Sequence, residues 1–316
     1  MLQSDFDLSS RNTFGLAARA ALAAVVTAPE QLAEIGREAA ARGLPVRVLG
    51  GGSNVLLPPR VQPVIAVMAI PGIAVVGESE DALIVEVGAG EDWHGLVART
   101  VGDGLGGLEN LAGIPGTVGA APVQNIGAYG VELEQRFHSL EAYDFVERQF
   151  RRFHREDGGF RYRHSVFKDE PGRFAIVSVR FALPRPWQPV RNYAGLAELP
   201  ETATPAEVMA RVLALRGSKL PDWRVLGNTG SFFQNPLVEA SVADAIADVP
   251  RYRAEDGLVK LSAAWLIEQC GLKGVRVGSA GVYPGHALVL VNHGGASYED
   301  VMALAGLVKA RVRERF

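Results

Sequence analysis

The spacing of apolar residues along the chain predicts a mixture of helices and strands. A capping box with a proline in its first turn, Thr27-Ala-Pro-Glu30, precedes apolar residues at helical spacing, and this pattern ends at Gly43. A second capping box, Thr204-Pro-Ala-Glu207, begins a similar pattern that ends near Gly217. Periodicity predicts further helices at residues 92–101, 242–246, 263–269 and 298–314. Short apolar runs predict strands at residues 45–49, 55–57, 64–68, 82–87, 174–183 and 287–292.

This mixture of elements indicates an α+β fold, and the length of the chain indicates more than one domain. The 316 residues, 48% of them hydrophobic, exceed what one core usually organises. The end of the helical pattern near Gly217 is the place where we expect a domain boundary, because the elements beyond it can form a compact unit of their own.

Charge and cysteine content narrow the range of partners and compartments. The 32 basic and 35 acidic residues give a formal net charge of -3, so neither nucleic acid nor a membrane surface is an expected partner. Cys270 is the only cysteine, and the N-terminus lacks the basic and apolar regions of a signal peptide. We therefore expect a soluble, cytoplasmic protein.

Glycine is in excess, and it is concentrated in two segments, residues 49–54 and 104–130. Backbone approaches a diphosphate closely where no Cβ intervenes, and clustered N–H groups form an anion site. For residues 50–54 an ordinary loop explains the glycines equally well. No Rossmann dinucleotide motif is present, because the third glycine position is occupied by Val55 after Gly50 and Gly52, and by Trp93 after Gly88 and Gly90. No P-loop is present either, because Ser218-Lys219 lacks the required glycine frame.

Other chemistries find little support. The six histidines lack metal-ligand spacing, so no metal site is predicted, and Ser231 lacks the frame of a hydrolase nucleophile. Residues 161–167 mix cations with aromatics, which suits an RNA-facing strand or a solvated edge, and these alternatives stay open. Residues 227–236 gather amides and hydroxyls around two phenylalanines, and an ordinary turn is an equal alternative.

A series of motifs runs nearly end to end along the chain. The motifs are Asn12–Gly15, Gly50–Asn54, Gly88–Gly90, Gly107–Gly116, Gln124–Gly130, Ala128–Glu132, Tyr162–Phe167, Trp187–Tyr193, Lys219–Asp222, Gly230–Pro236 and Lys260–Gly274. Taken in this order, they resemble the UDP-N-acetylenolpyruvoylglucosamine reductase family, in its first type.

The resemblance implies a two-lobed FAD-binding module of the vanillyl-alcohol-oxidase type, with lobes at residues 1–70 and 71–217, and a substrate-binding domain at residues 218–316. It implies non-covalent FAD and NADPH as the reductant. In that family NADPH reduces the flavin, and the flavin N5 then delivers hydride to C3 of UDP-N-acetylglucosamine enolpyruvate. The product, UDP-N-acetylmuramate, is a peptidoglycan precursor.

The resemblance also assigns roles to individual residues. Arg163 matches the family's catalytic arginine, which stabilises the enolic carboxylate. Ser231 matches the donor of the proton to C2. The implied substrate contacts are Tyr129, Tyr193, Lys219, Asn235 and His286. The implied cofactor contacts are Gly50, Gly51, Gly52, Ser53, Asn54, Val55, Gly113, Ile114, Pro115, Gly116, Thr117, Gly119, Ala120, Asn125, Gly127, Tyr162, Ile176 and Arg216.

One family residue has no counterpart in the sequence as written. The third catalytic residue of the family is a glutamate a few residues beyond the last helix, and the sequence ends at Phe316, whereas Glu314 aligns with a non-catalytic position. The resemblance therefore implies that this length binds FAD but turns over poorly. Two other functions stay open: an FAD-dependent alcohol or sugar oxidase, and a catalytically impaired protein that binds FAD or a nucleotide sugar.

Overall fold

The computed structural model describes residues 1–253 and 257–316, and its internal contacts divide the chain into two compact units. The first unit comprises residues 1–7, 19–52 and 60–216, and the second comprises residues 8–18, 53–59 and 217–316. The main segment of the second unit thus begins at Gly217. Its two short N-terminal segments are an addition that the sequence pattern did not indicate. The division of the first unit at residue 70 stays a prediction.

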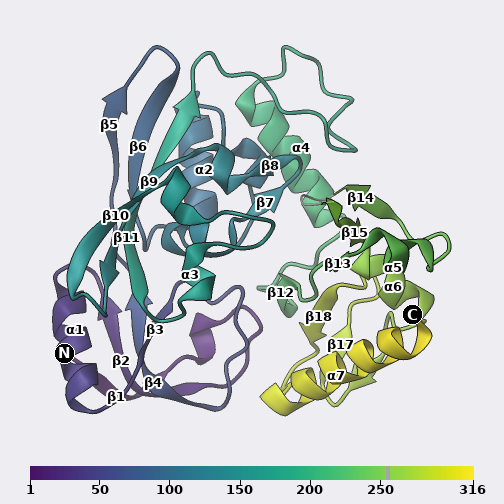
Figure 1. Ribbon diagram of the computed structural model, residues 1–316, viewed down its shortest axis with the longest axis horizontal. Helices are drawn as coiled ribbons and strands as arrows, with labels where there is room; N and C mark the ends of the chain where they lie inside the picture. The colour runs from purple at the N-terminus through teal and green to yellow at the C-terminus, as the bar shows by residue number, and fades with distance from the viewer. Residues whose placement is uncertain (254–256) are drawn as a thin grey trace. The chain divides into compact units, whose positions relative to one another are not determined.

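The first unit contains two main sheets (Figure 1). One has the strand order β1-β2-β4-β3, in which β4 pairs in parallel with both β2 and β3. The other is antiparallel, in the order β10-β9-β11-β6-β5. The strands are β1 (Gln3–Asp7), β2 (Arg19–Val26), β3 (Val46–Leu49), β4 (Arg60–Met68), β5 (Ile73–Glu78), β6 (Ala82–Gly88), β9 (Phe137–Asp144), β10 (Gln149–His154) and β11 (Phe174–Pro184).

Helices and short turns complete the first unit. Its helices are α1 (Gln31–Ala41), α2 (Trp93–Gly102), α3 (Val166–Asp169) and α4 (Pro205–Gly217, whose last residue is counted with the second unit). Its 3-10 helices and small hairpin are η2 (Glu109–Leu111), η3 (Val118–Ala120), η4 (Pro122–Gln124), η5 (Leu133–Gln135), η6 (Arg155–Gly158), β7 (Gly127–Ala128) and β8 (Val131–Glu132).

A single apolar core joins both sheets of the first unit with the helices. Trp93, at the start of α2, is only 1% exposed and packs edge-on against Phe181 of β11, with ring centroids 5.7 Å apart. The indole Nε1 donates to the carbonyl of Leu111 at 2.9 Å. The core therefore reaches the glycine-rich segment and fixes one end of η2.

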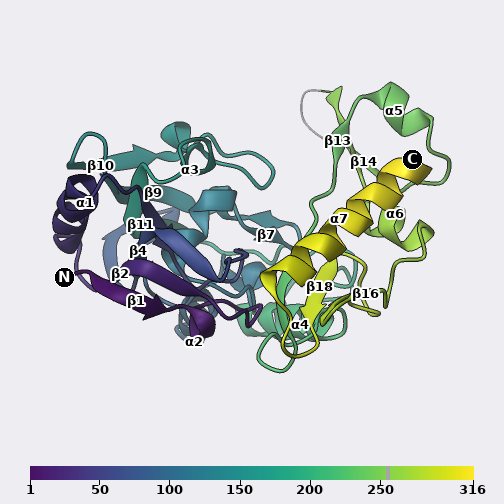
Figure 2. The same ribbon diagram turned by 90° about the horizontal axis from the view of Figure 1, so that it is seen from below.

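The second unit combines two small sheets with helices. The sheets have the orders β12-β18-β17-β16 and β13-β15-β14, and α7 packs against β16 and β17 (Figure 2). The elements are η1 (Ser9–Arg11), β12 (Gly227–Ser231), β13 (Leu237–Val238), α5 (Ala240–Asp244), β14 (Arg251–Arg253), β15 (Val259–Leu261), α6 (Ala263–Gln269), β16 (Arg276–Val277), β17 (Ala280–Val282), β18 (Val289–Asn292) and α7 (Tyr298–Arg315).

The N-terminal motif Asn12–Gly15 is part of this second unit. Thr13 Oγ1 donates to the carbonyl of Asn228 at 2.7 Å, and Asn292 Nδ2 donates to the carbonyl of Phe14 at 3.0 Å. Phe14 is fully buried in the core of the unit. The motif thus secures β12 and β18, the two strands that lead to the residues discussed below.

The α+β prediction is confirmed, and most predicted helices are present. The second capping box is confirmed, since Glu207 N donates to Thr204 Oγ1 and the Glu207 carboxylate accepts from Thr204 N. The first box is wrong. Residues 28–30 form a turn, α1 begins at Gln31, and Gln31 Oε1, instead of Glu30, accepts from the N–H groups of Thr27 and Ala28.

Two strand predictions need correction. Residues 55–57 form no strand, because the chain runs directly into Pro58 and Pro59, which have no N–H to donate to a sheet. The strand predicted at residues 287–292 begins only at Val289, after a turn in which His286 Nδ1 accepts from Leu288 N. The helix predicted at residues 242–246 lies two residues earlier, as α5. Within the described residues, no helix combines the length and apolar character needed to cross a membrane.

Candidate functional site

The two glycine segments of the first unit meet backbone to backbone. A Cβ on Gly51 would lie 2.8 Å from Gly116 Cα, and a Cβ on Gly50 would lie 2.4 Å from Thr117 Oγ1. A Cβ on Gly119 would lie 2.5 Å from the Cβ of Ala89. We call residues 50–52 and 116–119 the glycine junction. Its glycines are required because the two chain segments approach each other closely.

Hydrogen bonds to the start of α2 hold the second half of the glycine junction in place. Trp93 N donates to the carbonyl of Gly116 at 3.0 Å, and Val118 N donates to the carbonyl of Glu91 at 2.9 Å. Farther along, Gly113 N donates to Nδ1 of His94 at 3.2 Å. Loop backbone that is fixed in this way is preorganised, which is what an anion site made of N–H groups requires.

Two observations show that this region fits a phosphate-bearing cofactor. Thr117 Oγ1 is buried and has no hydrogen-bond partner among the residues that the structure describes. The partly buried Arg216, at the end of α4, lies beside Gly113, and no ion pair engages it within the described part of its unit. Burial lowers the pKa of Arg216, and the nearby Tyr129 opposes that effect. An unsatisfied hydroxyl and an unpaired guanidinium are suited to a diphosphate.

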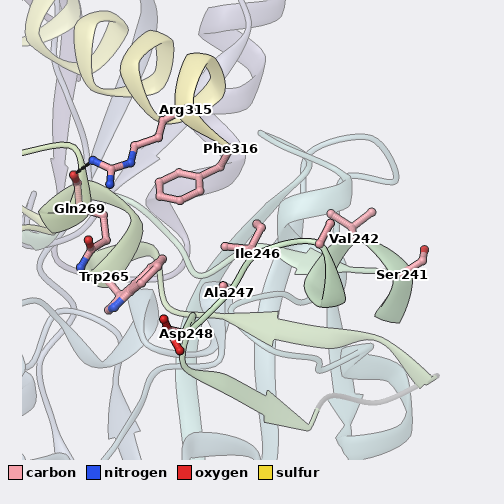
Figure 3. Close-up of a pocket in the computed structure, with 10 residues that line it drawn as sticks. Ser241, Val242, Ile246, Ala247, Asp248, Trp265, Gln269, Arg315 and Phe316 are labelled. Carbon is pink, nitrogen blue, oxygen red and sulfur yellow. Dashed lines mark hydrogen bonds between the residues drawn. The ribbon is translucent and has the colours of Figure 1, made fainter.

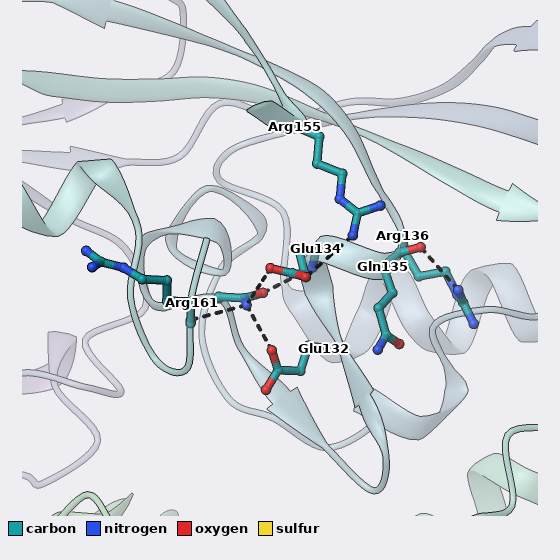
Figure 4. A network of polar contacts seen from close by, with 7 residues as sticks. Glu132, Glu134, Gln135, Arg136, Arg155 and Arg161 are labelled. Carbon is teal, nitrogen blue, oxygen red and sulfur yellow. Dashed lines mark hydrogen bonds and ion pairs between the residues drawn. The ribbon is translucent and has the colours of Figure 1, made fainter. Parts of the chain in front are cut away.

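Asn125 organises the segment that follows the glycine junction, and Figure 4 labels three residues that it contacts, Glu132, Glu134 and Arg161. This fully buried residue has a left-handed backbone (φ 42°), which asparagine tolerates better than most residues. Its Nδ2 lies 3.1 Å from Glu132 Oε2 and 3.3 Å from Glu134 Oε2, and its Oδ1 accepts from Glu134 N at 3.0 Å. The carbonyl of Arg161 also accepts from Nδ2. Asn125 thereby joins the β7–β8 hairpin to the chain before Arg163.

Arg163 is held by the backbone of this same segment. Its Nη2 donates to the carbonyl of Gly127 at 2.5 Å, and its Nη1 lies 3.4 Å from the carbonyl of Asn125. A Cβ on Gly127 would lie 2.9 Å from Nη1, so glycine is needed for the guanidinium to come this near. The guanidinium also lies over the ring of Tyr162, 5.2 Å from its centroid. The structure thus fixes a cation next to the predicted cofactor segment.

Tyr129 and Tyr193, the two predicted substrate tyrosines of the first unit, form a pair. Their ring centroids are 5.1 Å apart with an interplanar angle of 74°, an edge-to-face arrangement. Tyr129 is 9% exposed and Tyr193 is 39% exposed. Burial raises the pKa of Tyr129, and the positive charge of Arg216 lowers it. The structure therefore brings these two residues together with a predicted cofactor contact.

The second unit positions Ser231 at the end of β12. The strand pairs with β18, and an irregularity between Asn228 and Ser231 shifts the register so that Ser231 faces Val289. Phe232 N then donates to the carbonyl of Leu288 at 2.7 Å. Ser231 is exposed at this irregular end of the strand.

Two predicted substrate contacts of the second unit, His286 and Asn235, accept hydrogen bonds from backbone N–H groups. His286 is connected through Leu288 N, and burial lowers its pKa, a trend that Glu268 opposes and the positive charges of Lys219 and Lys273 reinforce. Asn235 Oδ1 accepts from Ala263 N at 2.9 Å, at the start of α6. Asn235 therefore has a structural task at this end of the helix, which the sequence did not reveal.

Four predicted cofactor residues lie outside the glycine junction, in the apolar core or in the second unit. Ile176 is 5% exposed, and its side chain belongs to the apolar core of the first unit. Ser53, Asn54 and Val55 are assigned to the second unit, whereas residues 50–52 belong to the first. Three other predicted cofactor residues of the first unit are partly buried: Ile114, Pro115 and Tyr162. Ala120, also predicted, is exposed. All of these roles stay predictions.

A separate cavity of about 650 Å³ occurs in the second unit (Figure 3). It lies between α5, α6 and the end of α7, with Trp265 and Phe316 among its lining residues. It contains none of the predicted catalytic or substrate residues, so it does not belong to the candidate site. In the described part of the chain, no group of three or more His, Cys, Asp or Glu residues could hold a metal ion.

Comparison with known proteins defines first the class and then the family. Residues 20–147 match the family model described as FAD binding domain, so the chain is that of a flavoprotein. Residues 221–316 match the family model for the C-terminal domain of UDP-N-acetylenolpyruvoylglucosamine reductase. The UDP-N-acetylenolpyruvoylglucosamine reductase of Bordetella pertussis is 50% identical, covering 98% of this chain and 91% of its own length. That of Ralstonia nicotianae is 49% identical, covering 100% of this chain and 96% of its own length.

A solved structure extends the likeness to the fold. The UDP-N-acetylenolpyruvylglucosamine reductase of Thermus caldophilus matches with a TM-score of 0.70 and 26% identity, covering 98% of this chain and 94% of that chain. The chain belongs to the UDP-N-acetylenolpyruvoylglucosamine reductase family. The resemblance that the sequence motifs indicated is thereby confirmed.

Proposed function

We propose that this protein is an FAD-dependent reductase that uses NADPH to convert UDP-N-acetylglucosamine enolpyruvate into UDP-N-acetylmuramate. Membership of the reductase family over nearly the whole chain supports this function. The structural observation that carries it is the Arg163 guanidinium, which is held by the carbonyls of Gly127 and Asn125 directly after the glycine junction. We place the reaction in peptidoglycan precursor synthesis and in the cytoplasm.

The first unit has the residues to hold FAD. Backbone of the glycine junction, the unsatisfied Thr117 hydroxyl and the unpaired Arg216 are the groups that suit its diphosphate. When bound, FAD supplies the redox chemistry, taking two electrons from NADPH and passing them to the enolpyruvyl double bond. The task of the protein is then to orient the substrate and to stabilise the charge that develops on it.

Arg163 suits the stabilisation of that charge. Reduction at C3 of the enolpyruvyl group places negative charge on C2 and on the adjoining carboxylate. A planar guanidinium has five N–H donors, and the two carbonyl contacts leave donors for a carboxylate. Because the guanidinium is already fixed by backbone, little reorganisation is needed as the charge forms.

Ser231 suits the second task, delivery of a proton to C2. A serine hydroxyl is a weak acid, and it can act here because the carbanion that it protonates is far more basic. Ser231 is exposed at the irregular end of β12, as a substrate-facing donor must be. The proton completes the saturated lactyl ether, and solvent then reprotonates the serine.

The test separates the two half-reactions by stopped-flow absorbance of the flavin. In Ser231→Ala, we expect NADPH to bleach the flavin at the wild-type rate. Reoxidation of the reduced flavin by the enolpyruvyl nucleotide sugar should be slower than in the wild type by a factor of about 10² or more. Ser241→Ala, at an exposed serine of α5, is the matched control and should leave both rates unchanged. Equal loss of both half-reactions in Ser231→Ala would refute the proton-donor role. Rapid reoxidation of the wild type by air alone would instead favour an oxidase.

A further inference from the structure

The short helix η2, inside the glycine-rich segment, contacts three different parts of the first unit. All three of its residues are buried. The Glu109 carboxylate accepts from Nε1 of Trp187 at 3.0 Å, and the Leu111 carbonyl accepts from Nε1 of Trp93. Between them, the amide of Asn110 lies fully buried, with none of its surface exposed. Neither tryptophan belongs to the residues assigned above to cofactor or substrate.

Asn110 connects the two segments that carry the tyrosine pair. Its Nδ2 donates to the carbonyl of Tyr129 at 2.8 Å and to the carbonyl of Val190 at 3.0 Å, three residues before Tyr193. Its Oδ1 has no hydrogen-bond partner within the described residues. Turning the amide around would set that oxygen against two carbonyl oxygens, so the donors define its orientation.

The backbone held by Asn110 has positive φ angles at two consecutive residues. Tyr129 has a positive φ of 49°, a conformation that side-chain-bearing residues adopt only when their surroundings impose it. The next residue, Gly130, also has a positive φ, and a Cβ there would lie 2.4 Å from Asn192 Oδ1. The two segments are thus in direct contact, and the amide bonds of Asn110 connect them from the buried side.

We propose that Asn110 is a positioning residue for substrate binding, which sets the Tyr129–Tyr193 pair by holding the carbonyls of Tyr129 and Val190. This inference rests on the proposed function, because it takes the two tyrosines as substrate contacts. Asn110 touches neither substrate nor cofactor in this role. It acts through the backbone of the two segments, so its removal should affect capture of the nucleotide sugar before it affects the flavin.

The experiment uses the holoenzyme and Asn110→Leu, which keeps the side chain branched at Cγ with the same number of heavy atoms and removes both N–H donors. The dissociation constant of UDP-N-acetylglucosamine enolpyruvate is measured from the change that it causes in flavin absorbance. We expect it to rise at least tenfold, while the rate of flavin bleaching by NADPH changes less than twofold. Thr100→Val is the matched control, because Thr100 donates a buried hydrogen bond to the carbonyl of Val97 within α2 and should leave the constant unchanged.

A double-mutant cycle distinguishes positioning from a general loss of stability. In a Tyr193→Ala background, where the pair no longer exists, Asn110→Leu should raise the dissociation constant less than twofold further. Faster tryptic cleavage after Arg191 in Asn110→Leu than in Thr100→Val would show that the segment is released. An equal effect of Asn110→Leu in both backgrounds, or no effect on substrate affinity, would overturn the positioning role. A wild type that fails to bind the nucleotide sugar would instead overturn the proposed function itself.

Discussion

Gly51→Ala is the substitution that tests most directly how the glycine junction is built. The added methyl group would lie 2.8 Å from Gly116 Cα and 3.2 Å from its carbonyl carbon. Both neighbours are backbone, so a rotamer change cannot relieve the contact, and the two segments must move apart. Gly51 itself is not in a positive-φ conformation, so the effect isolates packing from backbone strain.

Overpacking of this kind costs about 1–3 kcal/mol. With a central value of about 2 kcal/mol, and about 2–4 °C per kcal/mol for a unit of this size, the Tm of the first unit should fall by about 4–8 °C. FAD should also bind more weakly, by about tenfold or more, since about 1.4 kcal/mol of displaced contacts is a tenfold change in Kd.

Gly102→Ala is the matched control in the same unit. Gly102 ends α2, its φ is not positive, and a Cβ there would meet nothing within 4 Å. The same chemical change should therefore raise stability, by up to about 1 kcal/mol. Differential scanning calorimetry gives Tm, and quenching of flavin fluorescence gives Kd. An unchanged Tm and Kd in Gly51→Ala, or an equal loss in Gly102→Ala, would show that close approach does not explain these glycines.

Three further outcomes are expected. Asp144 is 1% exposed, and although burial acts to raise its pKa, Arg173 and backbone N–H groups hold that pKa below 3.8. Because the pKa of Asp144 is depressed in the folded protein, the stabilisation by its carboxylate is present above that value and is lost as the pH falls. Asp144→Asn should therefore lower the free energy of unfolding by about 1–3 kcal/mol at pH 7 and by less in acid. Urea titrations at several pH values can measure this difference. Ser297→Ala removes the capping box of α7 and should cost about 1 kcal/mol in a urea titration that follows the second unit. Arg216→Met removes a partly buried cation that has no ion pair within the described residues, so the apoprotein should keep its Tm while Kd for FAD rises at least tenfold. A lower Tm of the apoprotein with an unchanged Kd would contradict the role of Arg216 as an FAD contact.

The glycine-rich segment shows both what sequence reasoning could reach and where it stopped. A cluster of glycines indicates that something approaches the backbone closely, and the sequence predicted a diphosphate. The structure shows other segments of the chain at these glycines, and the diphosphate contact stays a prediction. The pattern could not reveal which atoms approach. At Gly116, Gly119 and Gly127 the neighbours are Gly51, Ala89 and Arg163, which lie far away in sequence. Only the folded chain specifies such partners, because nothing in local spacing records them.

The wrong strand prediction at residues 55–57 has its cause in the neighbouring sequence. The proline pair Pro58-Pro59 removes two consecutive donors, and giving this pair its full weight would have excluded the strand at residues 55–57. The sequence also contained a signal that could have identified Asn110. It stands between Leu108 and Leu111, and an amide placed among apolar residues is a candidate buried hydrogen-bonding group. Its partners, however, follow it by 19 and 80 positions, and no periodicity predicts contacts at such separations.

The segment from Gly104 to Gly130 has consequences for how the two half-reactions relate. The middle of the segment, residues 116–119 of the glycine junction, suits the cofactor, and its end carries Tyr129 of the substrate pair, to which Asn110 donates from within the same segment. Arg163 is held by the carbonyls of Asn125 and Gly127, which lie between these two parts. Rigid backbone of this kind transmits a displacement instead of absorbing it. A substitution that displaces the glycine junction, such as Gly51→Ala, should therefore also displace the backbone around Arg163 and Tyr129, so that capture of the nucleotide sugar weakens together with binding of FAD.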